Sequence, residues 1–215
     1  RQMCIRDSEI KGPLHRDVTL HYRETLSRIR ALEGEGDTGN ADNLKGYLRN
    51  VKMNQPAFVP SVSLEGGRSD RYITGYSGFI MGDIDGLEGD ALYRAMHRLR
   101  QDKYAFLVHF TLSGCGIRVL VRVDAPVTKR NFLSVWKKVN AYYADLLGVP
   151  MDLQCKNATR MSVICHDPDV LFRPDAEAFP VSDCAEDTAG DGRKAVTVRI
   201  CLLYTSPSPR DISGS

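Results

Sequence analysis

The order of strand-like and helical segments restricts the fold of this chain more than any other feature of its sequence. The strand-like runs are rich in β-branched and aromatic residues, and apolar residues recur at helical spacing in the two longer segments. The segments follow one another in the order β-α-β-β-α-β, at 72–85, 88–102, 104–112, 117–123, 128–148 and 160–165. This order predicts the split βαβ arrangement, which is an α+β fold.

The expected sheet is RRM-like or ferredoxin-like: it is antiparallel, has the spatial order 4-1-3-2 and carries both helices on one face. Apolar residues alternate strictly in the third strand, so Ile117 and Val119 should face the helices while Arg118 lies on the open face. The first and third strands should be central neighbours. The end of 72–85, the start of 117–123 and the start of the fourth strand then meet at one end of the sheet.

One folded domain is expected at 9–175, with a smaller N-terminal α/β unit at 9–71 ahead of the RRM-like core at 72–172. Within the smaller unit, 40–53 has the pattern of a helix. Beyond the domain the composition turns to Asp, Ala, Gly and Glu. We therefore interpret 176–200 as a linker toward a further C-terminal region.

Residues 1–8 and 201–215 are set apart because both resemble a translated sequencing adaptor. "RQMCIRDS" at the start and "CLLYTSPSPRD" near the end correspond to one transposon-end adaptor read in opposite directions. We expect these two segments to be non-native and to lie outside the fold. The natural part should run from Glu9 to Ile200 and be a fragment of a longer protein.

Composition argues against several classes of protein. The chain is 42% hydrophobic and 26% charged, an ordinary globular profile, and its net charge of +2 indicates no global attraction to nucleic acid or membranes. No apolar stretch approaches the roughly 20 residues of a membrane span, and no signal peptide is evident, so we expect a cytoplasmic protein with no membrane partner. The remaining cysteines lack CxxC spacing and are interpreted as reduced and structural: Cys115, Cys155, Cys165 and Cys184.

The first strand ends on two aspartates one residue apart, in "GDIDG". Residues i and i+2 of a strand share a face, so Asp83 and Asp85 should project together. Two carboxylates this close repel each other unless a cation lies between them, and Mg²⁺ binds through one or two carboxylates plus substrate phosphates. A pair of solvated turn aspartates is the alternative. An EF-hand loop is excluded, because Leu87 and Glu88 occupy the positions of a ligand and of the loop glycine.

The turn "SGCGIR" supplies candidate phosphate-binding residues at the same end of the sheet. Ser113, Gly114 and Gly116 leave backbone N–H groups unhindered, which suits a phosphate. Arg118 follows with a guanidinium that can bind two phosphate oxygens at once. A plain tight hairpin is the alternative for the turn taken alone.

The stretch "GVPMDLQCKNATR" supplies the third part of the candidate site. Asp152 precedes the fourth strand, where a third metal ligand would lie, and Arg160 begins that strand. Either residue could instead be an exposed loop residue. His166 and Asp167 are interpreted as a turn after the strand, and His109 as a structural histidine inside an apolar strand.

Three motifs together resemble the archaeo-eukaryotic primase superfamily: "GDID", "SGCGIRVLVRV" and "MDLQCKNATRMSVICHDPDV". Within that superfamily the chain is similar to VirE-type N-terminal domains, which lie ahead of helicase-like regions on plasmids and mobile elements. The resemblance covers 44–172. It implies that Asp83, Asp85 and Asp152 bind catalytic Mg²⁺ or Mn²⁺, and it implies that the serine-glycine turn holds the phosphates of a nucleotide.

The resemblance implies a DNA primase or primase-polymerase-like nucleotidyltransferase that acts in replication of a plasmid or mobile element. A 3′-hydroxyl would attack the α-phosphate of an NTP or dNTP on a single-stranded DNA template, with two metal ions and with Arg118, Ser113 and Arg160 positioning the triphosphate. Many members have a histidine where this chain has Arg118, and this difference bears on polymerase activity more than on nucleotide binding. A catalytically weak single-stranded nucleic-acid-binding module and a metal-dependent nuclease remain as alternatives.

Overall fold

The computed structural model describes residues 10–184 and the backbone of 201–203. The fold is α+β with antiparallel sheets, as the sequence predicts. The main sheet has the strand order β4-β6-β5-β8, and all of its pairs are antiparallel. Its strands are β4 (Phe79–Asp85), β5 (Ala105–Phe110), β6 (Gly116–Arg122) and β8 (Leu171–Phe172).

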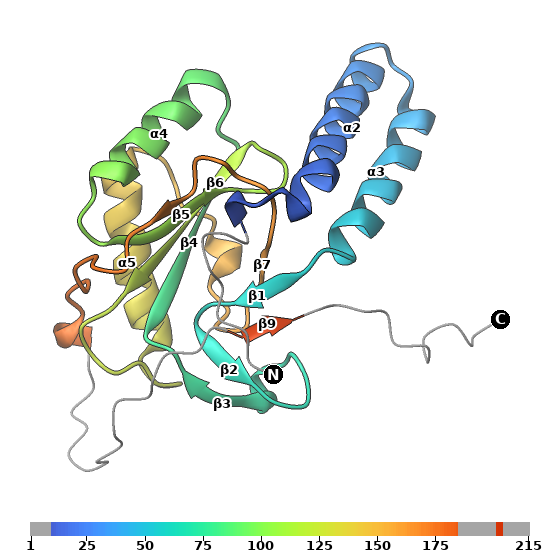
Figure 1. Cartoon of the computed structure of the whole chain (residues 1–215). Helices are drawn as coiled ribbons and strands as arrows, with labels where there is room; N and C mark the ends of the chain where they lie inside the picture. The colour runs from blue at the N-terminus through green and yellow to red at the C-terminus, as the bar shows by residue number, and fades with distance from the viewer. Residues whose placement is uncertain (1–9, 185–200, 204–215) are drawn as a thin grey trace.

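Both long helices of the core lie on one face of this sheet, as expected (Figure 1). They are α4 (Gly89–Gln101) and α5 (Phe132–Leu147). Ile84, Ile117 and Val119 are fully buried in the cluster that joins sheet and helices, which confirms the alternation read from the sequence. Gly148 ends α5 with φ +68°, a left-handed conformation that glycine adopts without strain.

The expected strand order 4-1-3-2 is wrong at its outer strand. The fourth expected strand is reduced to β7 (Ser162–Val163), which pairs with β1 (Ala57–Val59) in a separate small sheet instead of with β4. β8 occupies the opposite edge of the main sheet, beside β5. A two-residue strand gains few backbone hydrogen bonds from either partner, so side-chain packing and the bond from Ile164 N–H to Pro56 O (2.8 Å) decide where it lies.

The expected first strand divides into two. Gly78, with φ +76°, separates β3 (Ile73–Tyr76) from β4. β3 forms a hairpin with β2 (Val62–Leu64), as a separate two-stranded sheet.

The sheet face expected to be open is covered. Ile10, Phe58 and Ile164 pack on it and are at most 1% exposed. They contact the side chains of β4, β5 and β6 that point away from the helices: Phe79, Met81, Leu107 and Leu120. Arg118 therefore lies in a buried layer, at 8% exposed, and not on a solvated surface.

The N-terminal region at 9–71 has both helices and strands, as expected for an α/β unit, because it contains β1 and β2 as well as a helical hairpin. The hairpin consists of α2 (Arg16–Gly34) and α3 (Thr38–Met53), which pack side by side (Figure 1). Tyr22 and Ile29 of α2 share one apolar cluster with Leu112, two residues after the end of β5. The hairpin thus lies against the turn that links β5 to β6.

The folded region extends further than expected at its C-terminal side. Phe179 and Val181 fall in the expected linker, yet they are 4% and 1% exposed and pack in the helix-covered core. The N–H of Phe179 also donates to Arg122 O at 2.7 Å. The fold continues to Cys184, and 185–200 lie outside the described residues.

The segments set apart in the sequence are described only in part. The backbone of β9 (Cys201–Leu203) pairs antiparallel with β1, so these three residues join a sheet despite the expectation. Residues 1–8 and 204–215 lie outside the described residues. Among the helices that the structure describes, each is too short or too polar to cross a lipid bilayer.

Candidate active site

Three polar side chains lie in one row across the sheet. Asp83 of β4 is directly opposite Arg118 of β6, and Arg118 is directly opposite His109 of β5. Neighbouring strands lie about 4.7–4.9 Å apart, so the row is compact. The strand pairing thus brings Asp83 of the first acidic motif next to Arg118, as expected.

Arg118 and Asp83 form a buried ion pair. The Nε and Nη2 groups of Arg118 donate to Oδ2 of Asp83 at 3.3 and 3.1 Å. The Nη1 group donates to Ser162 Oγ at 3.1 Å. Arg118 is 8% and Asp83 1% exposed, so each charge depends on the other for compensation.

His109 completes the row as a neutral side chain. Its Nδ1 is 2.8 Å from Phe110 O, and its Nε2 is 3.4 Å from Ser162 Oγ. Complete burial, together with the charge of Arg118, lowers the pKa of His109 to about 4. This environment fits the structural role expected for His109.

Asp152 lies beside Asp83 because a short turn brings it there. Its backbone N–H donates to Asp83 O at 3.0 Å, and its side chain caps the 3₁₀ helix η3 (Leu153–Cys155) by accepting from Gln154 N–H at 2.8 Å. That hydrogen bond lowers the pKa of Asp152. Asp152 is therefore a half-exposed carboxylate at the end of β4, where the third ligand was expected.

Cys155 stands between the two carboxylates. Its Sγ is 3.3 Å from Asp83 Oδ2 and 3.2 Å from Asp152 Oδ2. Each of these three residues offers one ligand atom, and the three atoms lie within 4.8 Å of one another. Burial, and then the charge of Asp83, raises the pKa of the Cys155 thiol. The cluster has the size and the donors of a metal site.

Asp83 Oδ1 has no hydrogen-bond partner among the described residues, although the side chain is buried. A buried carboxylate oxygen without a partner is costly. A divalent cation at this point would satisfy it, so the residues fit a metal.

Asp85 lies near this cluster but is not part of it. Its side chain is exposed, and Oδ1 packs against Gly116, where an added Cβ would lie 2.6 Å from it. Although the residue is exposed overall, neighbouring protein atoms partly desolvate its carboxyl group; this desolvation, followed by the charge of Asp83, raises the pKa of Asp85. Asp83 and Asp85 thus interact as like charges, while the compact ligand set pairs Asp83 with Asp152 and Cys155.

The serine-glycine turn is held by α2. Arg23 donates from Nε to Leu112 O and from Nη2 to Thr111 O, both at 3.3 Å. Gly114 has φ +73°, and an added Cβ would lie 3.0 Å from Arg23 Nε. Ser113 Oγ is engaged within the turn, 3.0 Å from Thr111 Oγ1. The N–H groups of this turn were expected to be open to a phosphate, but that of Gly114 donates to Thr111 O at 2.9 Å and that of Cys115 to Ser113 Oγ at 3.4 Å. The guanidinium of Arg23 beside the turn was not predicted from the motif.

Arg160 is the outermost of the expected residues. Its side chain is exposed two residues before β7, and its charge contributes to the lowered pKa of Asp152. His166 and Asp167 have structural partners: His166 Nδ1 is 3.0 Å from Gly12 O, and Asp167 Oδ2 accepts from Phe110 N–H at 2.7 Å.

Sequence reasoning missed Cys155, Ser162 and Arg23. A signal for Cys155 exists in "DLQC", since residues i and i+3 align on a 3₁₀ turn. Ser162 and Arg23 approach the site only through the packing of β7 and α2. The sequence carries no local signal for these two contacts.

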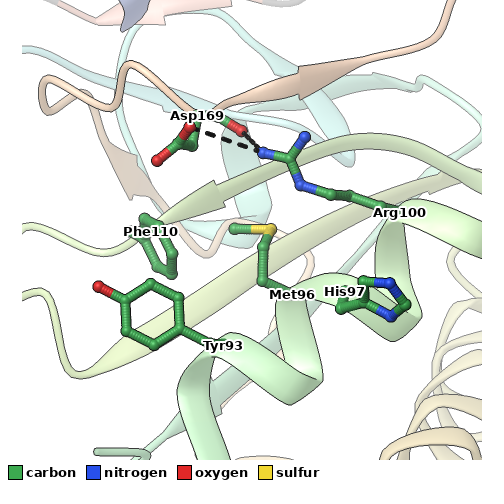
Figure 2. A pocket seen from close by; sticks show the side chains of 6 residues that line it. All are labelled: Tyr93, Met96, His97, Arg100, Phe110 and Asp169. Atoms are coloured by element: carbon green, nitrogen blue, oxygen red, sulfur yellow. Dashed lines mark hydrogen bonds and ion pairs between the residues drawn. The ribbon is translucent and has the colours of Figure 1, made fainter. Parts of the chain in front are cut away.

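A separate pocket of about 220 Å³ lies between α4 and the end of β5. Figure 2 shows its side chains, with Arg100 donating to Asp169 O at 2.5 Å. The expected site residues are not among those that line it: Tyr93, Met96, His97, Arg100, Phe110 and Asp169. This pocket is distinct from the acidic cluster.

Comparison with family models matches residues 50–172 to the family described as "BT4734-like, N-terminal domain". Comparisons with curated proteins and with solved structures give no match. The matched region is more than half of the 215-residue chain and contains the acidic cluster, the serine-glycine turn and Arg160. The chain belongs to the BT4734-like N-terminal domain family.

Proposed function

We propose that this domain is a metal-dependent nucleotidyltransferase of the primase type, acting in replication of a plasmid or mobile element. The observation that carries the proposal is the approach of Asp83, Asp152 and Cys155 to within 4.8 Å, with Asp85 beside them. Neighbouring carboxylates disfavour each other's ionised form, and a bound cation would offset this repulsion. Their position at the end of β4 agrees with the three-motif resemblance.

Mg²⁺ or Mn²⁺ would be held by Asp83 and Asp152, with Asp85 completing the acidic set. When bound, such ions activate the attacking 3′-hydroxyl and stabilise the leaving pyrophosphate. The unpartnered Asp83 Oδ1 supports this assignment. The raised pKa of Asp85 supports it as well, because a cation beside two interacting carboxylates would relieve their repulsion.

The triphosphate of an NTP or dNTP would lie against the basic residues around the acids. Arg160 is exposed near Asp152 and is free of the buried layer. The turn at Ser113 lies beside Arg23, whose guanidinium adds a second positive charge to that of Arg160. Arg118 would bind phosphate only by exchanging a contact with Asp83 or Ser162. Single-stranded DNA is the template in this proposal.

A catalytically weak single-stranded nucleic-acid-binding module is the second candidate. The observation that favours it is the burial of Arg118, whose guanidinium already forms an ion pair with Asp83. In that case the acids would serve the fold and the exposed basic residues would contact the DNA backbone.

One experiment separates the two candidates. The protein is incubated with a single-stranded DNA template, Mn²⁺ and labelled NTP or dNTP, and binding of the same DNA is measured without metal. The transferase is supported if the parent protein forms labelled product and Asp152→Asn does not. Asp145→Asn, on the exposed side of α5, is the control and should still form product. DNA binding with no product in either nucleotide set would contradict it and leave the binding module.

A further inference from the structure

The chemistry of Cys155 distinguishes this cluster from an all-carboxylate site. Its thiol is 2% exposed and contacts one oxygen of Asp83 and one of Asp152, at 3.3 and 3.2 Å. A sulfur at this distance from two carboxylates occupies a ligand position. The three-motif resemblance implies acids alone, so it does not account for the sulfur.

A second, independent observation concerns the other oxygen of Asp83, Oδ1. Asp83 is 1% exposed, and its Oδ1 has no partner among the residues that the structure describes. The other oxygen, Oδ2, accepts from Arg118 and from Cys155. One oxygen of Asp83 thus remains available to a cation while the Arg118 ion pair persists.

We propose that Cys155, Asp83 and Asp152 form a three-ligand site for a divalent cation of the zinc class, in preference to Mg²⁺. On binding, the S–H bond of Cys155 breaks, its proton leaves to solvent, and the sulfur electron pair enters the bond to the cation. The inference rests on the metal site of the proposed function, but it does not depend on nucleotidyl transfer.

The type of ligand atom decides whether the site prefers Zn²⁺ or Mg²⁺. Thiolates select borderline and soft cations such as Zn²⁺, Co²⁺ and Cd²⁺, whereas Mg²⁺ prefers oxygen ligands in near-octahedral geometry. Three protein ligands also leave the fourth tetrahedral position of Zn²⁺ open, which is the arrangement of catalytic rather than structural zinc. Asp152 is half-exposed, so the open position can face solvent.

The test uses Cd²⁺ and Co²⁺, whose thiolate complexes give ultraviolet charge-transfer bands. Cys4, Cys115, Cys184 and Cys201 are first replaced by Ser, leaving the two buried thiols of Cys155 and Cys165. Cys155→Ser is then compared with Cys165→Ser, a matched change of a buried cysteine. Affinities for Zn²⁺, Cd²⁺ and Mg²⁺ are measured by competition, and folding is followed by thermal unfolding.

The expected result is a thiolate band in the background protein that is kept in Cys165→Ser and lost in Cys155→Ser. Zn²⁺ and Cd²⁺ affinity should fall by more than about 100-fold in Cys155→Ser, since losing even a partner behind a ligand costs roughly 10- to 100-fold. Cys155→Asp, an all-oxygen site, should instead gain Mg²⁺ affinity and lose Cd²⁺ affinity. The band in the background protein needs no variant at that position, so misfolding of Cys155→Ser does not remove the test.

Two results would overturn the inference. One is Cd²⁺ or Co²⁺ binding without a thiolate band, and the other is equal Zn²⁺ affinity in Cys155→Ser and Cys165→Ser. If either result is found while Mn²⁺ still binds through Asp152, the thiolate site is ruled out and the proposed function stands. A thiolate band without nucleotide transfer has the opposite meaning: the metal site stands and the proposed reaction fails.

Discussion

Arg118 on β6 lies directly opposite Asp83 on β4 and donates two hydrogen bonds to the same carboxylate oxygen, at 3.3 and 3.1 Å. Both side chains are buried, so the pair is an internal part of the site and not a surface contact. Arg118, which was expected on an open face of the sheet as a phosphate-binding residue, is thus the counter-ion that orients Asp83. Removal of either partner leaves a buried charge.

Arg118→Ala should therefore destabilise the fold by about 3–5 kcal/mol, the usual cost of breaking a buried ion pair from one side. Asp83→Asn combined with Arg118→Met should cost less than the sum of the two single changes, because neither charge is then left alone. Urea unfolding of the four proteins measures the coupling. Strict additivity would show that the pair contributes no interaction energy.

The pattern of one strand predicted much of this arrangement. The alternation in 117–123 correctly directs Ile117 and Val119 toward the helices and Arg118 away from them, because a strand has only two faces. The β-α-β-β-α-β order also gave the antiparallel neighbours β4 and β6. These inferences depend on local periodicity and on short connections, which the chain carries in its sequence.

The predictions from sequence that proved wrong concern contacts between short segments that are far apart in the chain. β1 and β7 are three and two residues long, and neither run shows which partner it will pair with. The layer of Ile10, Phe58 and Ile164 that covers this face of the sheet is assembled from three separate stretches. Cys155 lacks CxxC spacing, and its partners are carboxylates: Asp152 lies in the same short turn, whereas Asp83 is 72 residues away. The turn "DLQC" carries a local signal for the first contact, but no local pattern encodes the second.

Gly116 should tolerate no side chain. A Cβ there would lie 2.6 Å from both Asp85 Oδ1 and the backbone Ile84 O, and the backbone atom cannot move aside. Gly116→Ala should cost about 1–3 kcal/mol by overpacking. Gly46→Ala is the control: it has open space in the middle of α3 and should stabilise by about 0.5–1 kcal/mol. Equal melting temperatures for the two variants would contradict the described packing.

His109 should make stability depend on pH below neutrality. Its pKa falls from 6.5 to about 4 on folding, so the unfolded chain binds more protons between these values. The contribution of neutral His109 to the free energy of unfolding is complete above pH 6.5. It is lost as the pH falls toward 4, by about 3 kcal/mol in total. His109→Gln should flatten the dependence of the unfolding free energy on pH in this window. His97→Gln, which removes an exposed histidine of α4, is the matched comparison. If the stability of His109→Gln depends on pH in the same way as that of the parent protein, His109 is not buried as a neutral side chain.

The segment after β8 should prove to be part of the fold. Phe179 is 4% exposed and packs on Tyr104 and Tyr142, with ring centroids 5.0 and 5.1 Å away. Phe179→Ala should therefore destabilise by about 3–5 kcal/mol. Phe172→Ala, at a side chain that is 37% exposed on the edge strand, should cost distinctly less. If Phe179→Ala is as mild as Phe172→Ala, the segment is a linker after all.

The central claim is that Asp83 and Asp152 together hold a divalent cation, and Mn²⁺ binding followed by electron paramagnetic resonance tests it most directly. Free Mn²⁺ gives the signal, so bound ion is measured without any assumption about the reaction. Asp152→Asn keeps the acceptor for Gln154 N–H and removes only the charge, which leaves the fold in place. The account predicts saturable binding in the parent and in Asp145→Asn, and a loss of at least about 10-fold in affinity in Asp152→Asn. Identical titrations of the parent and Asp152→Asn would contradict it.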